Sequence, residues 1–209
     1  MQKLEELQFP SVILGRPEDV GLESDWVDIN NTQAGAIAVR HLIHNGYRRI
    51  AFVSDGDDKV FNQDRIEGYR RELTAEGIAP DESLVMHGEA DHESGCVCAK
   101  KLLEAENRPD AIICSNDKMA LGVLRTARAM GICVPQELGL VCCDNTVVTE
   151  LARPDITSID VDTFELGLQV AEILINRIEN AAASIRQILL STRIIEREST
   201  AKKRKGGGA

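Results

Sequence analysis

Two near-continuous apolar runs mark the chain, at Ala111–Ser115 and Gly139–Cys143. Neither shows the apolar/polar alternation of a strand with one face in water. Strands buried on both faces have this composition, and they are typical of parallel sheets. Shorter runs of the same kind predict further strands at residues 11–14, 49–54, 84–87, 157–161 and 188–195.

Between these runs, apolar positions recur every three or four residues, which is the helical period. The spacing predicts helices from about residues 32, 64 and 94, one directly after residue 117, and a last one over 164–178. Strands and helices therefore alternate along the chain. This order predicts an α/β fold, with parallel sheets flanked by helices on both faces.

Both apolar runs are followed by hydrogen-bonding pairs. Asn116-Asp117 follows the first and Asp144-Asn145 the second. Ligands of open parallel sheets bind beyond the carboxyl ends of the strands, so the two pairs predict one polar pocket. We expect Asp117 to cap the next helix, which leaves Asn116 facing the pocket. Asp144 directly follows buried residues and needs a donor, which a ligand would supply, and Asn145 is expected in a supporting role.

Further polar residues occur near the end of the strand predicted at residues 49–54. Arg65 lies at the start of the next helix, where its guanidinium could reach over the strand ends and bind vicinal hydroxyls or a carboxylate. The alternative is a solvated arginine paired with a neighbouring acid, and the residues leave both interpretations open. Secondary candidates for ligand contact, by position at strand ends, are Asp55, Asn62 and Gln63.

Charge and cysteine content limit which binding partners and which cellular compartment are expected for this chain. The formal net charge is −10 at pH 7 and the pI about 4.9, so the chain should repel phosphate backbones and anionic membranes. The first residues include glutamates and no long apolar run, so we expect no secretory signal and no membrane span. Six cysteines without a Cys-x-x-Cys pair indicate small core residues in a reducing cytoplasm.

Signatures of catalysis are absent from the sequence. It has no dinucleotide-binding glycine motif, no P-loop, no nucleophile elbow and no zinc-protease motif. His87, His92, Cys96 and Cys98 are metal-ligating types, but the two cysteines are two residues apart on a predicted helix and point in different directions. We therefore predict no enzyme activity, no metal site and no cofactor.

Five ordered segments resemble the effector-binding core of LacI/GalR transcriptional regulators. They are Gly35–Phe52, Arg65–Arg70, Ser115–Gly122, Gly131–Pro135 and Pro154–Ile159. The resemblance implies a type I periplasmic-binding-protein-like fold, in which two α/β lobes close on a small ligand. It also implies a homodimer that binds operator DNA through an N-terminal helix-turn-helix, with effector and DNA binding linked.

Matched by position, the family's effector-contacting arginine, asparagine and aspartate fall on Arg65, Asn116 and Asp144. Many members also carry an aromatic residue that stacks on the ligand, where this chain has Gly88-Glu89-Ala90. Loss of that ring counts against a pyranose or purine ligand.

The resemblance also implies where the lobes divide. Residues 1–46 with 156–184 are expected to form a partial first lobe, and residues 47–155 with 185–200 a nearly complete second lobe. On this comparison the chain is N-terminally truncated and lacks the DNA-binding headpiece. The basic and glycine-rich tail, residues 201–209, is expected to be disordered, which we prefer to a nucleic-acid-binding or nuclear signal.

These observations together predict the effector-sensing core of a LacI-type transcriptional regulator, with a small sugar or nucleoside-like ligand. The alternative is a periplasmic-type sugar-binding protein of a transport system, which uses the same fold. The expected absence of a signal segment counts against it. An enzyme using Asp144 as a base, with His87 or His92 as an acid, ranks last because no nucleophile or cofactor motif accompanies them.

Overall fold

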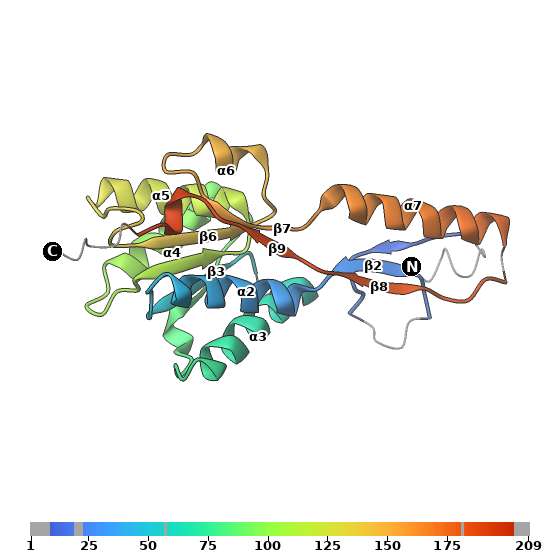
Figure 1. The fold of residues 1–209 in the computed structure, drawn as a ribbon, viewed down its shortest axis with the longest axis horizontal. Coiled ribbons are helices and arrows are strands. Elements are labelled where there is room, and N and C mark those ends of the chain that lie inside the picture. The colour runs from blue at the N-terminus through green and yellow to red at the C-terminus, as the bar shows by residue number, and fades with distance from the viewer. Residues whose placement is uncertain (1–8, 19–22, 57, 181, 203–209) are drawn as a thin grey trace, which may run out of the picture. The chain divides into compact units, whose positions relative to one another are not determined.

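The computed structural model describes residues 9–18, 23–56, 58–180 and 182–202. The chain divides into two compact units (Figure 1). The first unit comprises residues up to Asn30 together with Val161–Thr192, and the second comprises Asn31–Asp160 together with residues from Arg193 onward. Within the described residues, no helix is both long and apolar enough to cross a membrane.

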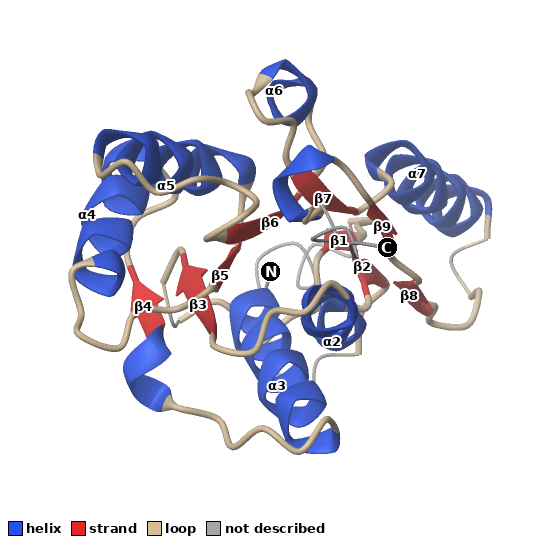
Figure 2. Ribbon diagram, turned by 60° about the vertical axis from the view of Figure 1, so that its left-hand side comes forward, coloured by secondary structure: helices blue, strands red, loops and turns tan. Residues whose placement is uncertain are grey.

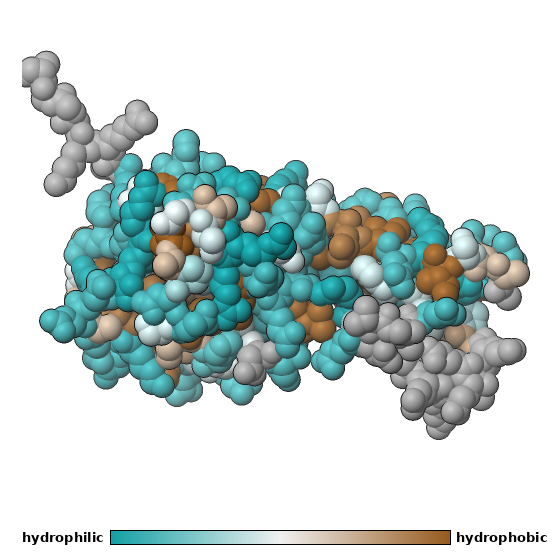
Figure 3. All heavy atoms as spheres, turned by 90° about the horizontal axis from the view of Figure 1, so that it is seen from below, coloured by the Kyte–Doolittle hydropathy of each residue, from teal (hydrophilic) through white to brown (hydrophobic). Residues whose placement is uncertain are grey.

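The first unit is a small parallel sheet covered by a helix. Its strands lie in the order β1 (Ile13–Leu14), β2 (Trp26–Ile29) and β8 (Gln187–Leu190), and α7 (Thr163–Glu179) contacts β2. All four residues of β2 are buried, as expected for a central strand. Apolar side chains nevertheless reach the surface of this unit (Figure 3).

The second unit is built around a six-stranded sheet. Its order is β4 (Val85–His87), β3 (Ile50–Ser54), β5 (Ala111–Cys114), β6 (Gly139–Cys143), β7 (Thr157–Asp160) and β9 (Arg193–Ile195), parallel except for the antiparallel β9. The helices are α2 (Asn31–His44), α3 (Val60–Ala75), α4 (His92–Leu103), α5 (Asp117–Ala129) and the short α6 (Val147–Leu151). Two 3-10 turns cover Glu82–Leu84 and Glu198–Thr200.

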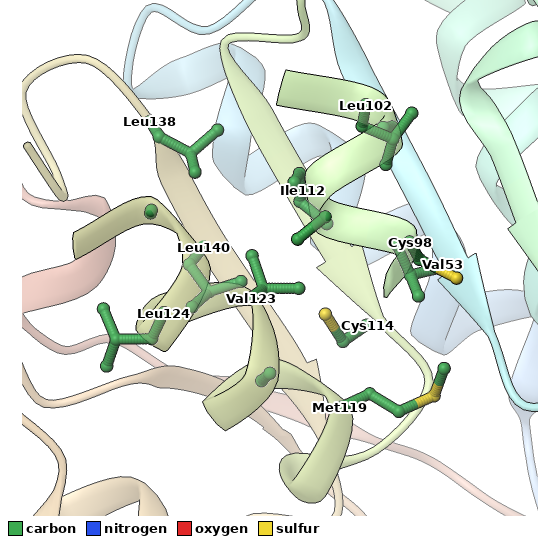
Figure 4. Packing of buried hydrophobic residues seen from close by; sticks show 14 of the residues in the cluster. Val53, Cys98, Leu102, Ile112, Cys114, Met119, Val123, Leu124, Leu138 and Leu140 are labelled. Carbon is green, nitrogen blue, oxygen red and sulfur yellow. The ribbon is translucent and has the colours of Figure 1, made fainter. Parts of the chain in front are cut away.

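Helix pairs cover both faces of this sheet, α4 with α5 on one side and α2 with α3 on the other (Figure 2). Successive strand residues point to opposite faces, so Ile112 and Cys114 join the α4/α5 core whereas Ala111 and Ile113 join the α2/α3 core. Figure 4 shows the first of these cores, with Met119 and Val123 of α5 facing the strands. Burial on both faces explains why the strand sequences lack alternation.

The unit boundaries differ from the expected lobes in three places: residues 31–46 and 156–160 belong to the second unit instead of the first, and residues 185–192 belong to the first unit instead of the second. Residues 31–46, expected in the first lobe, belong to the second unit because Ala38 and Leu42 pack into its α2/α3 core. Residues 188–195, expected as one strand, form two strands in different sheets. β8 pairs with β2 of the first unit and β9 with β7 of the second, and the break falls between Leu190 and Arg193.

The C-terminal segment of the second unit is held by buried hydroxyl groups. Ser199 Oγ accepts the Thr157 N–H at 2.8 Å and donates to the carbonyl of Leu140. Thr200 Oγ1 shares a 2.8 Å hydrogen bond with His41 Nε2 of α2. Lys202 Nζ lies 3.7 Å from the centre of the Tyr47 ring. Residues 201 and 202 therefore contact this unit, and residues 203–209 of the tail expected to be disordered lie outside the described part of the chain.

Docking of this segment is expected to weaken in mild acid, because burial lowers the pKa of His41 below 6.5 despite the nearby Glu196 carboxylate. The unfolded chain then binds a proton more readily than the folded chain. The free energy of unfolding should therefore fall as pH drops below about 6.5. Urea titrations at pH 7.5 and 5.5 measure this loss, which His41→Gln should reduce. The exposed His87→Gln is the control, and an equal effect of both substitutions would contradict the assignment.

Candidate functional site

Polar residues from three neighbouring strands meet at one edge of the second unit's sheet. Asp55 follows β3, Ser115 and Asn116 follow β5, and Asp144 follows β6. These strands are adjacent and parallel, so their carboxyl ends share one edge. The structure therefore brings the predicted strand-end residues together within a single unit.

Asp55 is the centre of a buried hydrogen-bond network. Its carboxylate accepts the Ser115 hydroxyl at 2.8 Å, the Asn62 amide at 2.8 Å and the Lys59 ammonium at 3.1 Å. Burial alone would raise the pKa of Asp55, but these three donors together lower it below its usual range. A carboxylate held by three donors is fixed in place and anionic. It orients Asn62, whose Oδ1 is buried without a hydrogen-bond partner among the described residues.

Arg65 is buried, with 6% of its surface exposed. Its Nε donates to Asn31 Oδ1 at 2.8 Å and its Nη1 to the carbonyl oxygen of Ser115 at 2.7 Å. The guanidinium also lies 5.2 Å from the centre of the Phe61 ring. The solvated alternative is therefore wrong for this arginine. Its remaining N–H groups stay available at the strand ends.

The helix cap expected at Asp117 is made by Asn116 instead. Asn116 has extended backbone angles and its Oδ1 accepts the Met119 N–H at 3.0 Å, so it is the N-cap of α5. Asp117 is the first helical residue, and its buried carboxylate accepts the Thr146 N–H and the Cys142 thiol. The Asn116 Nδ2 is buried and has no hydrogen-bond partner among the described residues. Asn116 thus caps the helix with its oxygen and keeps its amide donor unpaired.

Asp144 combines a strained backbone with an unpaired carboxylate. Its φ of 94° lies in the region that side chains other than glycine rarely adopt. Burial raises the pKa of Asp144 to about 6, an effect that Arg65 opposes and that Asp117 and Asp55 reinforce. No hydrogen bond reaches its carboxylate from the described residues. Such an acceptor is suited to a ligand donor.

Two further predicted residues are placed differently from this group. Asn145 Oδ1 accepts a 2.7 Å hydrogen bond from Arg197, so its side chain braces the C-terminal segment. Gln63 is the exposed member of the six candidates, on the first turn of α3. Of the six candidates, Arg65, Asn62 and Asp55 are therefore buried, whereas Gln63 is exposed.

Residues that contact these candidates were not identified from the sequence. Ser115 was assigned to the end of a predicted strand, and Lys59 and Phe61 lay before the predicted start of their helix. Asn31 stands 34 positions before Arg65. Position after a strand could have indicated Ser115, whereas no local pattern indicates the pairing of Asn31 with Arg65.

Of the histidines and cysteines weighed as metal ligands, His87 is the last residue of β4 and pairs with Ser54 of β3. His92 and Cys96 line an open cavity of about 520 Å³ beside α4 and α5, which contains none of the candidate residues. Among the described residues, no group of three or more His, Cys, Asp or Glu side chains could hold a metal ion.

Comparison with known proteins tests the predicted resemblance to LacI/GalR transcriptional regulators. The family of periplasmic binding protein-like domains matches residues 39–200. The HTH-type transcriptional regulator CelR of Thermobifida fusca is 36% identical over 199 residues, which are 95% of this chain and 58% of CelR. The chain thus spans less than two thirds of the length of this relative.

Solved structures of transcriptional regulators also match this chain. A transcriptional regulator CelR–cellobiose complex matches with a TM-score of 0.90 and 36% identity, over 95% of this chain and 61% of that one. A LacI family regulator from Enterococcus faecium with bound ribose matches with a TM-score of 0.87 and 25% identity, over 97% and 75% of the two chains. The predicted fold class and resemblance are confirmed. The chain belongs to the LacI family of transcriptional regulators and has the fold of a periplasmic-binding-protein-like domain.

Proposed function

We propose that this chain senses a small polyhydroxylated effector, a sugar or a nucleoside, for a LacI-type transcriptional regulator. The observation that carries the proposal is the unpaired Asn116 Nδ2, a buried donor at the strand ends. Beside it, Arg65 offers further N–H donors, and Asp144 offers a carboxylate that no described residue engages. A hydroxyl group both donates and accepts, so adjacent ligand hydroxyls would satisfy all three residues.

Two of the three ligand-facing residues, Asn116 and Arg65, are held by the fold before a ligand arrives. Asn116 is fixed by its capping bond to Met119, and Arg65 by its two hydrogen bonds. Binding then costs little side-chain ordering. Recognition is the whole chemistry of this site, and we propose no catalysis. The hydrogen-bond network around Asp55 supports this binding site; its other members are Ser115, Asn62 and Lys59.

The rest of the regulator's activity is also part of the proposal. The relatives with matching structures are named as transcriptional regulators, and two of those structures hold cellobiose and ribose. This supports a cytoplasmic homodimer that binds operator DNA through a helix-turn-helix outside this chain. It favours that role over delivery of sugar to a transporter.

The test is a thermal-shift screen of the chain against cellobiose, D-ribose, other sugars and nucleosides. A ligand that binds only the folded state at one hundred times its Kd stabilises that state by about 2.7 kcal/mol. We expect at least one compound to raise Tm. Absence of a shift with every compound at millimolar concentration would contradict the proposed ligand class.

Asn116→Asp is the informative variant because an aspartate keeps the cap oxygen but removes the Nδ2 donor. The shift should disappear in this variant. Asn107→Asp makes the same change at an exposed loop position and should leave the shift intact. A full shift with Asn116→Asp would exclude the amide as a ligand donor.

A further inference from the structure

We propose that Asn31 is a positioning residue for Arg65, and that its side-chain oxygen sets the guanidinium orientation in which the effector is bound. The effector part of this inference rests on the function proposed above. Asn31 follows β2 of the three-stranded sheet and not a strand of the six-stranded sheet. It is the first residue of α2, and it acts on the ligand through Arg65.

The contacts of Arg65 define one orientation of its guanidinium plane. The Nε–H points to Asn31 Oδ1 at 2.8 Å and one Nη1–H points to the Ser115 carbonyl at 2.7 Å. Two acceptors at different edges of a planar group fix the plane. The Nη2 group is not used by either bond, so it is the part left for a ligand.

Burial makes both bonds strong determinants of geometry. Arg65 is 6% exposed and Asn31 is 2% exposed, so water cannot readily replace the lost acceptor. A buried charged donor left unpaired is costly, and the side chain would turn to find another acceptor. Without Asn31, one competing acceptor is Asp144, since Arg65 is close enough to lower its pKa. Arg65 and Asp144 would then hydrogen-bond each other instead of the ligand.

The backbone explains why a residue 34 positions away reaches Arg65. Helices α2 and α3 cross in direct backbone contact at Gly35 and Gly68. A Cβ on Gly35 would overlap the carbonyl oxygen of Arg65, and one on Gly68 would overlap that of Thr32. This close crossing brings the start of α2 alongside the first turns of α3, where a side chain as short as asparagine spans the remaining distance.

An asparagine at this position also preserves the charge of the site. A carboxylate would hold the Nε–H as well, but it would neutralise the cation whose charge lowers the pKa of Asp144. The amide oxygen orients Arg65 while its positive charge remains directed to the strand ends. Orientation and charge can therefore be separated experimentally, because Asn31→Asp keeps the acceptor and Asn31→Ala removes it.

The first measurement needs no ligand. In the chain labelled with 15N-arginine, the Arg65 Nε–Hε resonance is assigned by its absence in Arg65→Lys. We expect it to be protected from exchange in the parent and in Asn31→Asp. Loss of the acceptor in Asn31→Ala should shift it and speed its exchange. Asn107→Ala is the matched control at an exposed site. An unchanged Hε resonance in Asn31→Ala would overturn the positioning role.

The second measurement uses cellobiose and D-ribose in calorimetric titrations. Loss of one charge-assisted hydrogen bond corresponds to an increase in Kd of about tenfold for Asn31→Ala. In an Arg65→Lys background, which lacks Nε, the same substitution should add no further loss. An equal loss in both backgrounds would overturn the inference. If the parent binds neither sugar, the ligand class proposed above fails for these compounds, while the Hε measurement still decides the Asn31–Arg65 bond.

Discussion

Replacement of Gly68 by alanine should destabilise the second unit by about 3 kcal/mol, the upper end of the usual cost of overpacking. The added Cβ would overlap the carbonyl and Cα of Thr32 in α2. These are backbone atoms, which cannot move aside by changing rotamer, so the two helices must separate. Separation would also pull Asn31 from Arg65, one helical turn from the substitution. Urea unfolding followed by circular dichroism measures the loss.

Gly167→Ala is the control because it adds the same methyl group where no heavy atom lies within 4 Å. Gly167 lies within α7, so alanine should stabilise that helix by up to about 1 kcal/mol through its higher helix propensity. The two substitutions should therefore shift the urea midpoint in opposite directions. Parent-like stability of Gly68→Ala would show that the crossing of α2 and α3 is looser than the structure indicates.

The alternation of strands and helices in the second unit could be predicted because its strands are buried on both faces. Ala111–Cys114 and Gly139–Cys143 appear as unbroken apolar runs for this reason. The strand Trp26–Ile29 is equally buried but was missed, since it is short and contains Asp28. That carboxylate is satisfied by the N–H groups of Arg16 and Ile29, an arrangement with no local sequence signal.

The start of α3 was not predictable because no capping side chain marks it. α3 begins at Val60, four residues before the predicted Asp64, because its N-cap Lys59 makes no side-chain capping bond. At α5 the sequence offers two capping residues in succession, Asn116 and Asp117. Tertiary contacts select Asn116 as the cap, because the Asp117 carboxylate accepts hydrogen bonds from Thr146 in the adjacent loop and Cys142 in the adjacent strand.

The residues of the candidate site could be predicted from the sequence, but the hydrogen bonds between them could not. Asn116 and Asp144 follow from their position after buried strands, and Arg65 from its place near a strand end. The bonds that hold Arg65 span 34 and 50 residues, and the bond between Asp55 and the Ser115 hydroxyl spans 60. Contacts at such separations depend on the packing of whole elements. Patterns of neighbouring residues do not contain them.

Asp144→Asn should stabilise the folded chain at neutral pH, by on the order of 1–2 kcal/mol. Burial raises the pKa of Asp144 from 3.8 to about 6. The folded chain therefore binds this proton more tightly than the unfolded chain. Its contribution to the free energy of unfolding falls as pH rises from about 4 to about 6, and the loss persists above that. Asparagine removes the buried charge and tolerates the φ of 94° better than aspartate.

Effector binding should change in the opposite direction, because the amide offers one acceptor oxygen and no charge where the ligand donor meets a carboxylate. We expect Kd for a binding sugar to rise about tenfold or more. Urea titrations at pH 4, 5 and 7.5 should show the stability advantage of Asp144→Asn growing with pH. Asp81→Asn is the matched control, since hydrogen bonds from Ser83 and Arg49 lower the pKa of Asp81, so its substitution should not stabilise the chain. A residue retained for ligand binding at the expense of stability gives this combination of gain and loss. Asp144→Asn that left both stability and affinity unchanged would place Asp144 outside the site.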